Sequence, residues 1–275
     1  MKHEKTVMWI KFAVILILAL IFIYPMFLVF INSVKPLKEI IANPLSLPGS
    51  VDFDNYVKTW GIMDIPKIVR NTAVITIFSL AGIIMLTSMT AYWTVRHPTK
   101  YSRIFNGAVL LSALVPFAAI MIPEIQVLHT ISLINTLPGT ILVYWGIGIP
   151  FAFFIIQSAV KGLPVELEES AMIDGCSRIG IFFKIVLPLL KPAITTVAVM
   201  DIFWIWNDFM VPLITLNNGK MSTIQLAISK LFGQYSSKWD IALPALVITL
   251  IPILVVFIVL QKRIVDGITA GAVKG

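Results

Sequence analysis

Six apolar runs of about twenty residues make up nearly half of this 275-residue chain. They cover residues 12–31, 71–95, 104–122, 139–160, 193–216 and 241–260. About twenty helical residues cross the hydrocarbon layer of a membrane, where every backbone polar group needs a partner within the protein. With 58% hydrophobic and 13% charged residues, the chain has too little polar sequence to cover a soluble domain. The sequence therefore predicts an all-α integral membrane protein with six transmembrane helices in one domain over residues 1–275.

Prolines and polar stretches mark where these helices bend or end. Prolines expected to kink or end a helix are Pro25, Pro116, Pro150, Pro212 and Pro252. Residues 32–70 are predicted to form an ordered external loop with short helices, and residues 123–138 a short connection. Residues 217–240 are predicted to form a longer polar loop that begins with a turn at Asn217-Asn218-Gly219. Residues 261–275 are expected to form a short tail.

The distribution of positive charge predicts the orientation of the chain. Of its lysines and arginines, 13 lie on the side that carries both termini and 8 on the opposite side. The side richer in Lys and Arg faces the cytoplasm, so both termini and the segment 161–192 are predicted to be cytoplasmic. The same flanking residues explain the net charge of +7, so we expect no nucleic-acid partner. The first run is too long for a typical signal peptide and is expected to remain uncleaved.

Residues that carry chemistry are scarce. The single cysteine, Cys176, excludes an internal disulfide, and the three histidines have no ligand spacing, so we expect no metal site. No phosphate loop of the form Gly, four residues, then Gly-Lys-Ser/Thr occurs, and the glycine-rich end at 267–274 does not supply one. We therefore expect this chain to bind no cofactor. If it performs work across the membrane, the energy for that work must come from another chain or from a gradient.

The segment 161–192 is the most strongly patterned polar stretch and predicts two short helices. Pro164 suits a first helical position, acidic residues fill the first turns, and Gly175 supplies a flexible stop. This predicts a helix from about residue 164 to 174. A second helix is predicted from about residue 177 to 187, ending at Pro188. The pair is expected to lie on the membrane surface as a helix-turn-helix.

The same segment resembles the EAA loop of binding-protein-dependent ABC importer permeases, with every spacing kept. The matching positions are Glu169, Ser170, Ala171, Gly175, Ile185, Leu187 and Pro188. Ser170 departs from the usual alanine, and Cys176 stands where a small alanine is common. Trp206-Asn207 and the ending at 267–275 are similar to the MalG-like branch of carbohydrate permeases. The resemblance covers roughly residues 70–275.

This resemblance implies the type I ABC importer permease fold with a cytoplasmic coupling helix. It implies a subunit, not itself an enzyme, that forms half of the pathway for a sugar or oligosaccharide. The implied partners are a second homologous permease, two ATP-binding subunits that hold ATP and Mg²⁺, an extracellular solute-binding protein and the lipid bilayer. The implied location is the cytoplasmic membrane of a bacterium or archaeon.

The resemblance also assigns roles within the loop and the tail. The residues expected to couple the chain to the ATPase are Glu166, Glu169, Ser170, Ala171, Met172, Asp174 and Gly175. Glu169 is expected to make a charged contact, Ala171 and Met172 to form the apolar seat, and Gly175 to form a turn where a side chain would collide. Gly271 and Lys274 in the tail are implied to reach between the ATPase subunits. A helix merely resting on lipid is disfavoured because acidic residues repel anionic headgroups.

The fifth run contains the candidates for the solute pathway. A bare carboxylate near mid-membrane is costly, so Asp201 is expected either to line the pathway or bond another subunit, or to lie near the wet cytoplasmic end. Asn207 and Asp208 are expected either to line a polar cavity or to cap the helix. Trp206 either stacks on a sugar ring or anchors the helix at the membrane interface.

Two other function classes fit less well. A secondary transporter of a small polar solute, driven by an ion gradient, predicts several intramembrane charges and usually pseudo-symmetric halves. Asp201 is thin support for it, and no internal repeat is visible. A membrane enzyme requires paired carboxylates or a His/Cys cluster facing a pocket. The only crowded acidic residues lie at 166–174, on a predicted surface helix.

Overall fold

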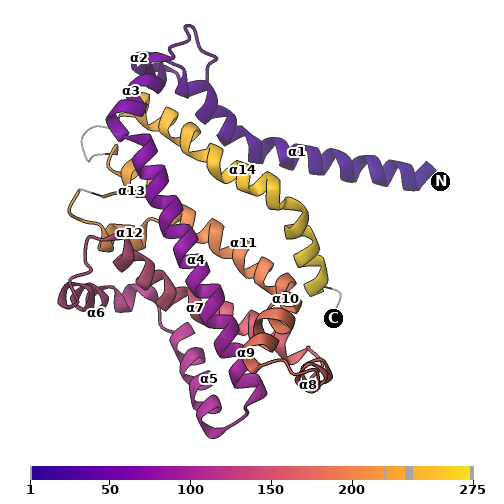
Figure 1. Cartoon of the computed structure of the whole chain (residues 1–275). Helices are drawn as coiled ribbons and strands as arrows, with labels where there is room; N and C mark the ends of the chain where they lie inside the picture. The colour runs from indigo at the N-terminus through magenta and orange to yellow at the C-terminus, as the bar shows by residue number, and fades with distance from the viewer. Residues whose placement is uncertain (1, 220, 233–237, 273–275) are drawn as a thin grey trace. The chain divides into compact units, whose positions relative to one another are not determined.

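The computed structural model describes residues 2–219, 221–232 and 238–272, and its regular structure is helical almost throughout (Figure 1). The four longest helices are α1 (Lys2–Ser33), α4 (Ile65–Arg96), α7 (Leu137–Lys161) and α14 (Trp239–Ala272). Among the described residues, four helices are long and apolar enough to cross a membrane, and up to six spans result if each of two bent helix pairs counts as one. The predicted all-α class with several apolar spans is confirmed.

The third predicted run is bent. The chain forms α5 (Lys100–Ala113) and α6 (Phe117–Thr130), with an angle of 107° between them. Pro116 is the N-cap residue of α6, and it lacks the backbone N–H that would continue α5. The sequence predicted a run over 104–122 that Pro116 kinks or ends, and a connection over 123–138. The structure instead continues helix to Thr130, with Pro123 inside α6.

The fifth predicted run is interrupted near both ends. Before it lie α9 (Arg178–Ile181), the π-helix η1 (Phe182–Val186) and α10 (Leu187–Leu189), which meet α11 (Lys191–Asn207) at an angle of 69°. The helix expected to stop at Pro188 therefore continues to Leu189. After α11, Asp208 is extended, and the chain restarts as α12 (Met210–Thr215).

Other prolines have weaker effects than the sequence suggested. Pro25, Pro150 and Pro252 lie inside α1, α7 and α14, which continue through them. At the end of the chain, α14 continues as far as Ala272, where a short tail was expected from residue 261. Gly271 lies in this helix, and Lys274 lies outside the described residues.

The described chain groups into two compact units. The first comprises residues 1–67 and 227–252, and contains α2 (Leu37–Ala42) and α3 (Asp54–Met63). Its loop is ordered by buried polar bonds, as predicted for residues 32–70. The ammonium of Lys35, which has no exposed surface, donates to the carbonyl oxygens of Asn43 and Ser46 at 3.2 and 2.6 Å. Such bonds satisfy a charge that would otherwise be costly to bury.

The second unit comprises residues 68–226 and 253–275 and is built around α7. This helix packs against α5, α6, α11 and α12, and its Tyr144, Phe153 and Ile156 have no exposed surface. Close approach to α4 depends on Gly82, where an added Cβ would lie 2.1 Å from the ring of Trp145. The Trp145 indole donates to the carbonyl oxygen of Phe78 at 3.2 Å, which fixes the ring.

Between α12 and α14 the polar loop has the predicted turn. Asn217 and Asn218 form it, and Gly219 follows with a left-handed φ of 75°. A short helix, α13 (Ile224–Ser229), then precedes α14. The sequence did not predict this helix.

Candidate functional site

The candidate site centres on α8 (Glu166–Ile173), the short acidic helix in the segment 161–192. The structure shortens the predicted helix of 164–174 slightly at both ends. Glu166, Glu168 and Glu169 occupy its first turn, where negative charge complements the positive end of the helix dipole.

A left-handed glycine ends α8. Gly175 has a φ of 82°, and its N–H donates to the Met172 carbonyl at 3.1 Å. The Cys176 N–H donates to the Ala171 carbonyl at 2.9 Å, which completes a Schellman motif. Within this chain, a Cβ on Gly175 would meet nothing within 4 Å. The glycine is thus required here by its backbone conformation, and the collision expected from the sequence does not occur with any described residue.

The two faces of α8 differ in what they contact. Glu168 and Ala171 are buried, each 6% exposed, against the rest of the second unit. Elsewhere around the helix, Leu167 and Met172, which flank the buried face, are 43% and 50% exposed, and Ile173, which lies away from it, is 87% exposed. Ala171, expected in the apolar seat for a partner, therefore packs into the chain's own core. The accessible apolar surface consists of the other three residues, and the expected coupling residues Glu166, Glu169, Ser170 and Asp174 are exposed beside it.

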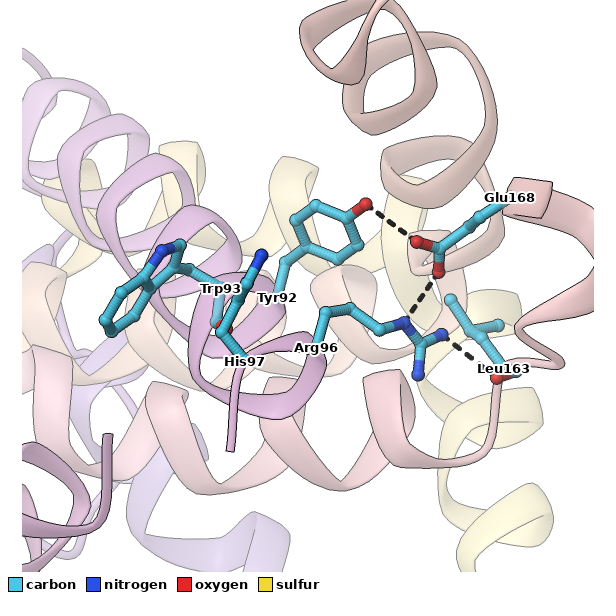
Figure 2. Close-up of polar contacts among 6 residues, drawn as sticks. All are labelled: Tyr92, Trp93, Arg96, His97, Leu163 and Glu168. Carbon is cyan, nitrogen blue, oxygen red and sulfur yellow. Dashed lines mark hydrogen bonds and ion pairs between the residues drawn. The ribbon is translucent and has the colours of Figure 1, made fainter. Parts of the chain in front are cut away.

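A partly buried cluster, which we call the α4–α8 clamp, holds α8 to the end of α4 (Figure 2). The Glu168 carboxylate accepts from Arg96 Nε at 2.7 Å and from the Tyr92 hydroxyl at 2.7 Å. Arg96 Nη2 also donates to the carbonyl oxygen of Leu163 at 3.0 Å. The side chains of Arg96 and Glu168 are 13% and 8% exposed. The clamp comprises Tyr92, Arg96, Leu163 and Glu168.

Asp201 lies on the buried side of α11. It is 3% exposed, between Val197 and Ile205 one turn away on either side, which are also buried. Its Oδ2 is closed off by the chain and accepts no hydrogen bond from the described residues. In this conformation neither solute nor a second subunit reaches that oxygen. Exposure of Asp201 to a pathway therefore requires movement of α11 against its neighbours.

The other pathway candidates have local bonds. Asp208 accepts from the backbone N–H groups of Met210 and Val211 at 3.2 and 3.1 Å, and from the Tyr144 hydroxyl at 2.9 Å. Asp208 thus caps the start of α12. Asn207 is exposed and donates to the Phe203 carbonyl at 2.8 Å. Trp206 is only 7% exposed, so the chain itself covers most of its ring.

Comparison with known proteins places this geometry in a family. The model of the family described as "Binding-protein-dependent transport system inner membrane component" matches residues 83–269, which include α8 and the whole α4–α8 clamp. The chain belongs to this family. It is therefore a transport subunit, a permease with several membrane spans.

Relatives of the permease match it over nearly its whole length. It is 37% identical to "Probable starch degradation products transport system permease protein AmyC" of Thermoanaerobacterium thermosulfurigenes, over 94% of each chain. It is 31% identical to "Arabinooligosaccharides transport system permease protein AraQ" of Bacillus subtilis, over 94% of this chain and 93% of the relative. A solved bacterial ABC transporter involved in the import of the acidic polysaccharide alginate has the same fold. That match has a TM-score of 0.81 at 21% identity and covers 94% of this chain and 97% of the other.

Sequence reasoning missed the α4–α8 clamp of the permease. The sequence prediction counted Glu168 only among the acidic residues of a helix start, and it gave Arg96 no functional role. The two residues are 72 positions apart, so no local pattern joins them. The available signal was weak: Tyr92 and Arg96 are four residues apart and so lie on one face at the end of a predicted helix.

Replacing Asp208 by alanine is expected to destabilise the permease. The substitution removes the cap of α12 and leaves the hydroxyl of Tyr144, a residue with no exposed surface, without its partner. Losing a cap and leaving a buried hydroxyl unpaired lowers the free energy of unfolding by about 1–3 kcal/mol. Thermal unfolding of the purified protein in detergent measures the loss. The control is Asn207→Ala, at the exposed neighbouring position; an equal loss in both variants would contradict the capping role.

Proposed function

We propose that the permease forms half of the translocation pathway of an ATP-driven importer for an oligosaccharide. The observation that carries the proposal is the 37% identity to AmyC over 94% of both chains, since that relative is named for transport of starch degradation products. AraQ, named for arabinooligosaccharides, supports the same class of solute. An extracellular binding protein delivers the solute, in keeping with the family description.

The energy comes from two ATP-binding subunits, one of which binds the exposed face of α8. Leu167, Met172 and Ile173 are large apolar side chains left exposed on an acidic helix, as is typical of a protein-binding surface. A short helix of this kind inserts into a groove on its partner, and Glu169 beside it offers a charged contact. ATP and Mg²⁺ are held by those subunits, and the C-terminal segment of the chain, with Gly271 and Lys274, reaches between them.

The remaining arrangement follows from charge. The excess of Lys and Arg on the side of the termini supports a cytoplasmic location for both termini and for α8. A second homologous permease completes the pathway in the cytoplasmic membrane of a bacterium or archaeon. When ATP closes the ATP-binding subunits, α8 moves with them and shifts the membrane helices between inward-open and outward-open states. Asn207, whose amide is accessible, is our remaining candidate for contact with solute.

Uptake by cells that lack this permease tests the proposal. Cells are given radiolabelled maltooligosaccharides or arabinooligosaccharides, with the wild-type gene returned on a plasmid as the control. We expect the deletion to abolish uptake of one of these sugars and the plasmid to restore it. Uptake should persist when an ionophore collapses the ion gradients at constant ATP, and stop when ATP is depleted. Uptake that follows the gradient instead of ATP would favour an ion-driven secondary transporter.

A further inference from the structure

The α4–α8 clamp joins three elements at one carboxylate. Glu168 belongs to α8, while Arg96 and Tyr92 belong to the last turns of α4 (Figure 2). The Tyr92 ring also packs on Phe182 of η1, with ring centroids 5.5 Å apart. Both oxygens of the Glu168 carboxylate are thus engaged by α4, and the same tyrosine contacts the π-helix that follows α8 in the chain.

Arg96 fixes α8 at two separate points. Its Nε donates to the Glu168 side chain, and its Nη2 donates to the backbone carbonyl of Leu163, which precedes α8. The guanidinium group is planar and rigid, so these two bonds set the direction of the helix as well as its distance from α4. A lysine ammonium lacks the rigid, planar fork with which the guanidinium holds these two acceptors in fixed directions.

The C-terminal end of α8 is followed by the left-handed turn at Gly175. The helix is therefore connected to α9 by a tight turn and to α4 by the clamp, while its opposite face is open. A force applied to that open face has two routes into the membrane helices. The route through Gly175 runs along the chain, and the route through the clamp crosses to a helix 72 residues away in sequence.

We propose that Arg96 and Glu168 are positioning residues that transmit movement of α8 to α4, so that ATP hydrolysis by the partner subunits is converted into solute movement. This inference rests on the proposed function, because it takes α8 as the helix that binds those subunits. Tyr92 supports the pair by donating to the second oxygen of Glu168 and by contacting η1. Loss of the pair uncouples transport from ATP hydrolysis without removing the surface that binds the ATPase.

The alternative is that Arg96 and Glu168 only stabilise the fold. A double substitution distinguishes this role from the transmission of movement. Removing one partner leaves a buried charge unpaired and destabilises any protein, whereas replacing both by apolar residues of similar size often restores stability. The test variant is therefore Arg96→Met with Glu168→Leu, in the complete transporter in proteoliposomes. Arg103→Met is the matched control, since Arg103 is exposed on α5 outside the clamp.

Three quantities are measured for each complex: copurification of the ATP-binding subunits, ATP hydrolysis stimulated by the binding protein, and solute taken up per ATP hydrolysed. We expect the double variant to keep the ATP-binding subunits while its uptake per ATP falls about tenfold, the scale of an ordinary coupling between two sites. Arg96→Lys should lower uptake per ATP less, and Arg103→Met should leave it unchanged.

Uptake per ATP at the wild-type level in the double variant would overturn the inference and leave a stabilising role. Should the double variant fail to assemble, Glu168→Gln decides, since it keeps the size of the side chain and the bond from Tyr92; full coupling in that variant overturns the inference equally. Failure of the wild-type chain to bind any ATP-binding subunit would overturn the proposed function itself, so the two failures are distinguishable.

Discussion

Replacing Gly175 by leucine together with Glu169 by alanine is expected to abolish solute uptake while the permease still inserts in the membrane. Gly175 has a φ of 82°, a conformation that costs an ordinary residue about 1–2 kcal/mol. Leucine therefore disrupts the Schellman turn that closes α8 and redirects the helix toward its partner. Glu169→Ala removes an exposed charge from the same binding face. Uptake of labelled oligosaccharide and copurification of the ATP-binding subunits should both fall, and unchanged uptake would contradict the role of α8.

A second substitution at Gly175 shows why this position requires glycine. Asparagine adopts the left-handed conformation more readily than leucine, yet it carries a side chain. A Cβ at this position meets nothing within 4 Å in the permease itself. If the backbone conformation alone requires glycine, Gly175→Asn should keep most of the uptake. Loss of uptake in that variant would instead show that a partner packs directly against residue 175, as the resemblance to the EAA loop implied.

Local patterns in the sequence predicted α8 and its end well. The proline and acidic residues at its start and the glycine at its end are signals within a few residues of one another, and the observed helix, Glu166–Ile173, lies inside the predicted range. The presence of several apolar segments was also predictable, because each span requires its own run of residues. These features depend on neighbouring residues, which is why one sequence suffices to find them.

Features that depend on distant contacts were not predictable. Pro116 marked a kink or end within the third apolar run, but neither the proline nor the hydropathy gave the size of the 107° bend there. Ala171 was predicted at a partner surface and is buried, because helix periodicity alone does not say which side faces the chain's own core. The sequence prediction chose Glu169 as the functional residue and not Glu168. The pairing of Glu168 depends on Arg96 of another helix, which the local sequence does not reveal. The sequence therefore indicated the function of the segment 161–192, but not which side of α8 faces the chain's own core.

The turn before α7 gives the largest expected effect on stability. A Cβ on Gly139 would lie 2.1 Å from the backbone carbonyl oxygen of Leu133, closer than any real contact. That oxygen also accepts from the Thr136 hydroxyl at 2.7 Å, and Thr136 in turn accepts from the Gly139 N–H at 3.1 Å. The turn has little freedom to relax, since its Asn135, with a left-handed φ of 62°, donates its N–H to the Thr215 carbonyl at 2.8 Å.

Gly139→Ala is therefore expected to lower the free energy of unfolding by about 3 kcal/mol, at the upper end for an overpacked site. Gly146→Ala is the matched control on the same helix, because a Cβ there meets nothing within 4 Å. In a helix interior alanine is favoured over glycine by about 1 kcal/mol, so the control should be at least as stable as the wild-type permease. Thermal unfolding in detergent compares the two variants. The same substitution at two positions seven residues apart is thus expected to change stability in opposite directions. Equal changes in unfolding temperature in the two variants would show that the turn before α7 has room for a methyl group.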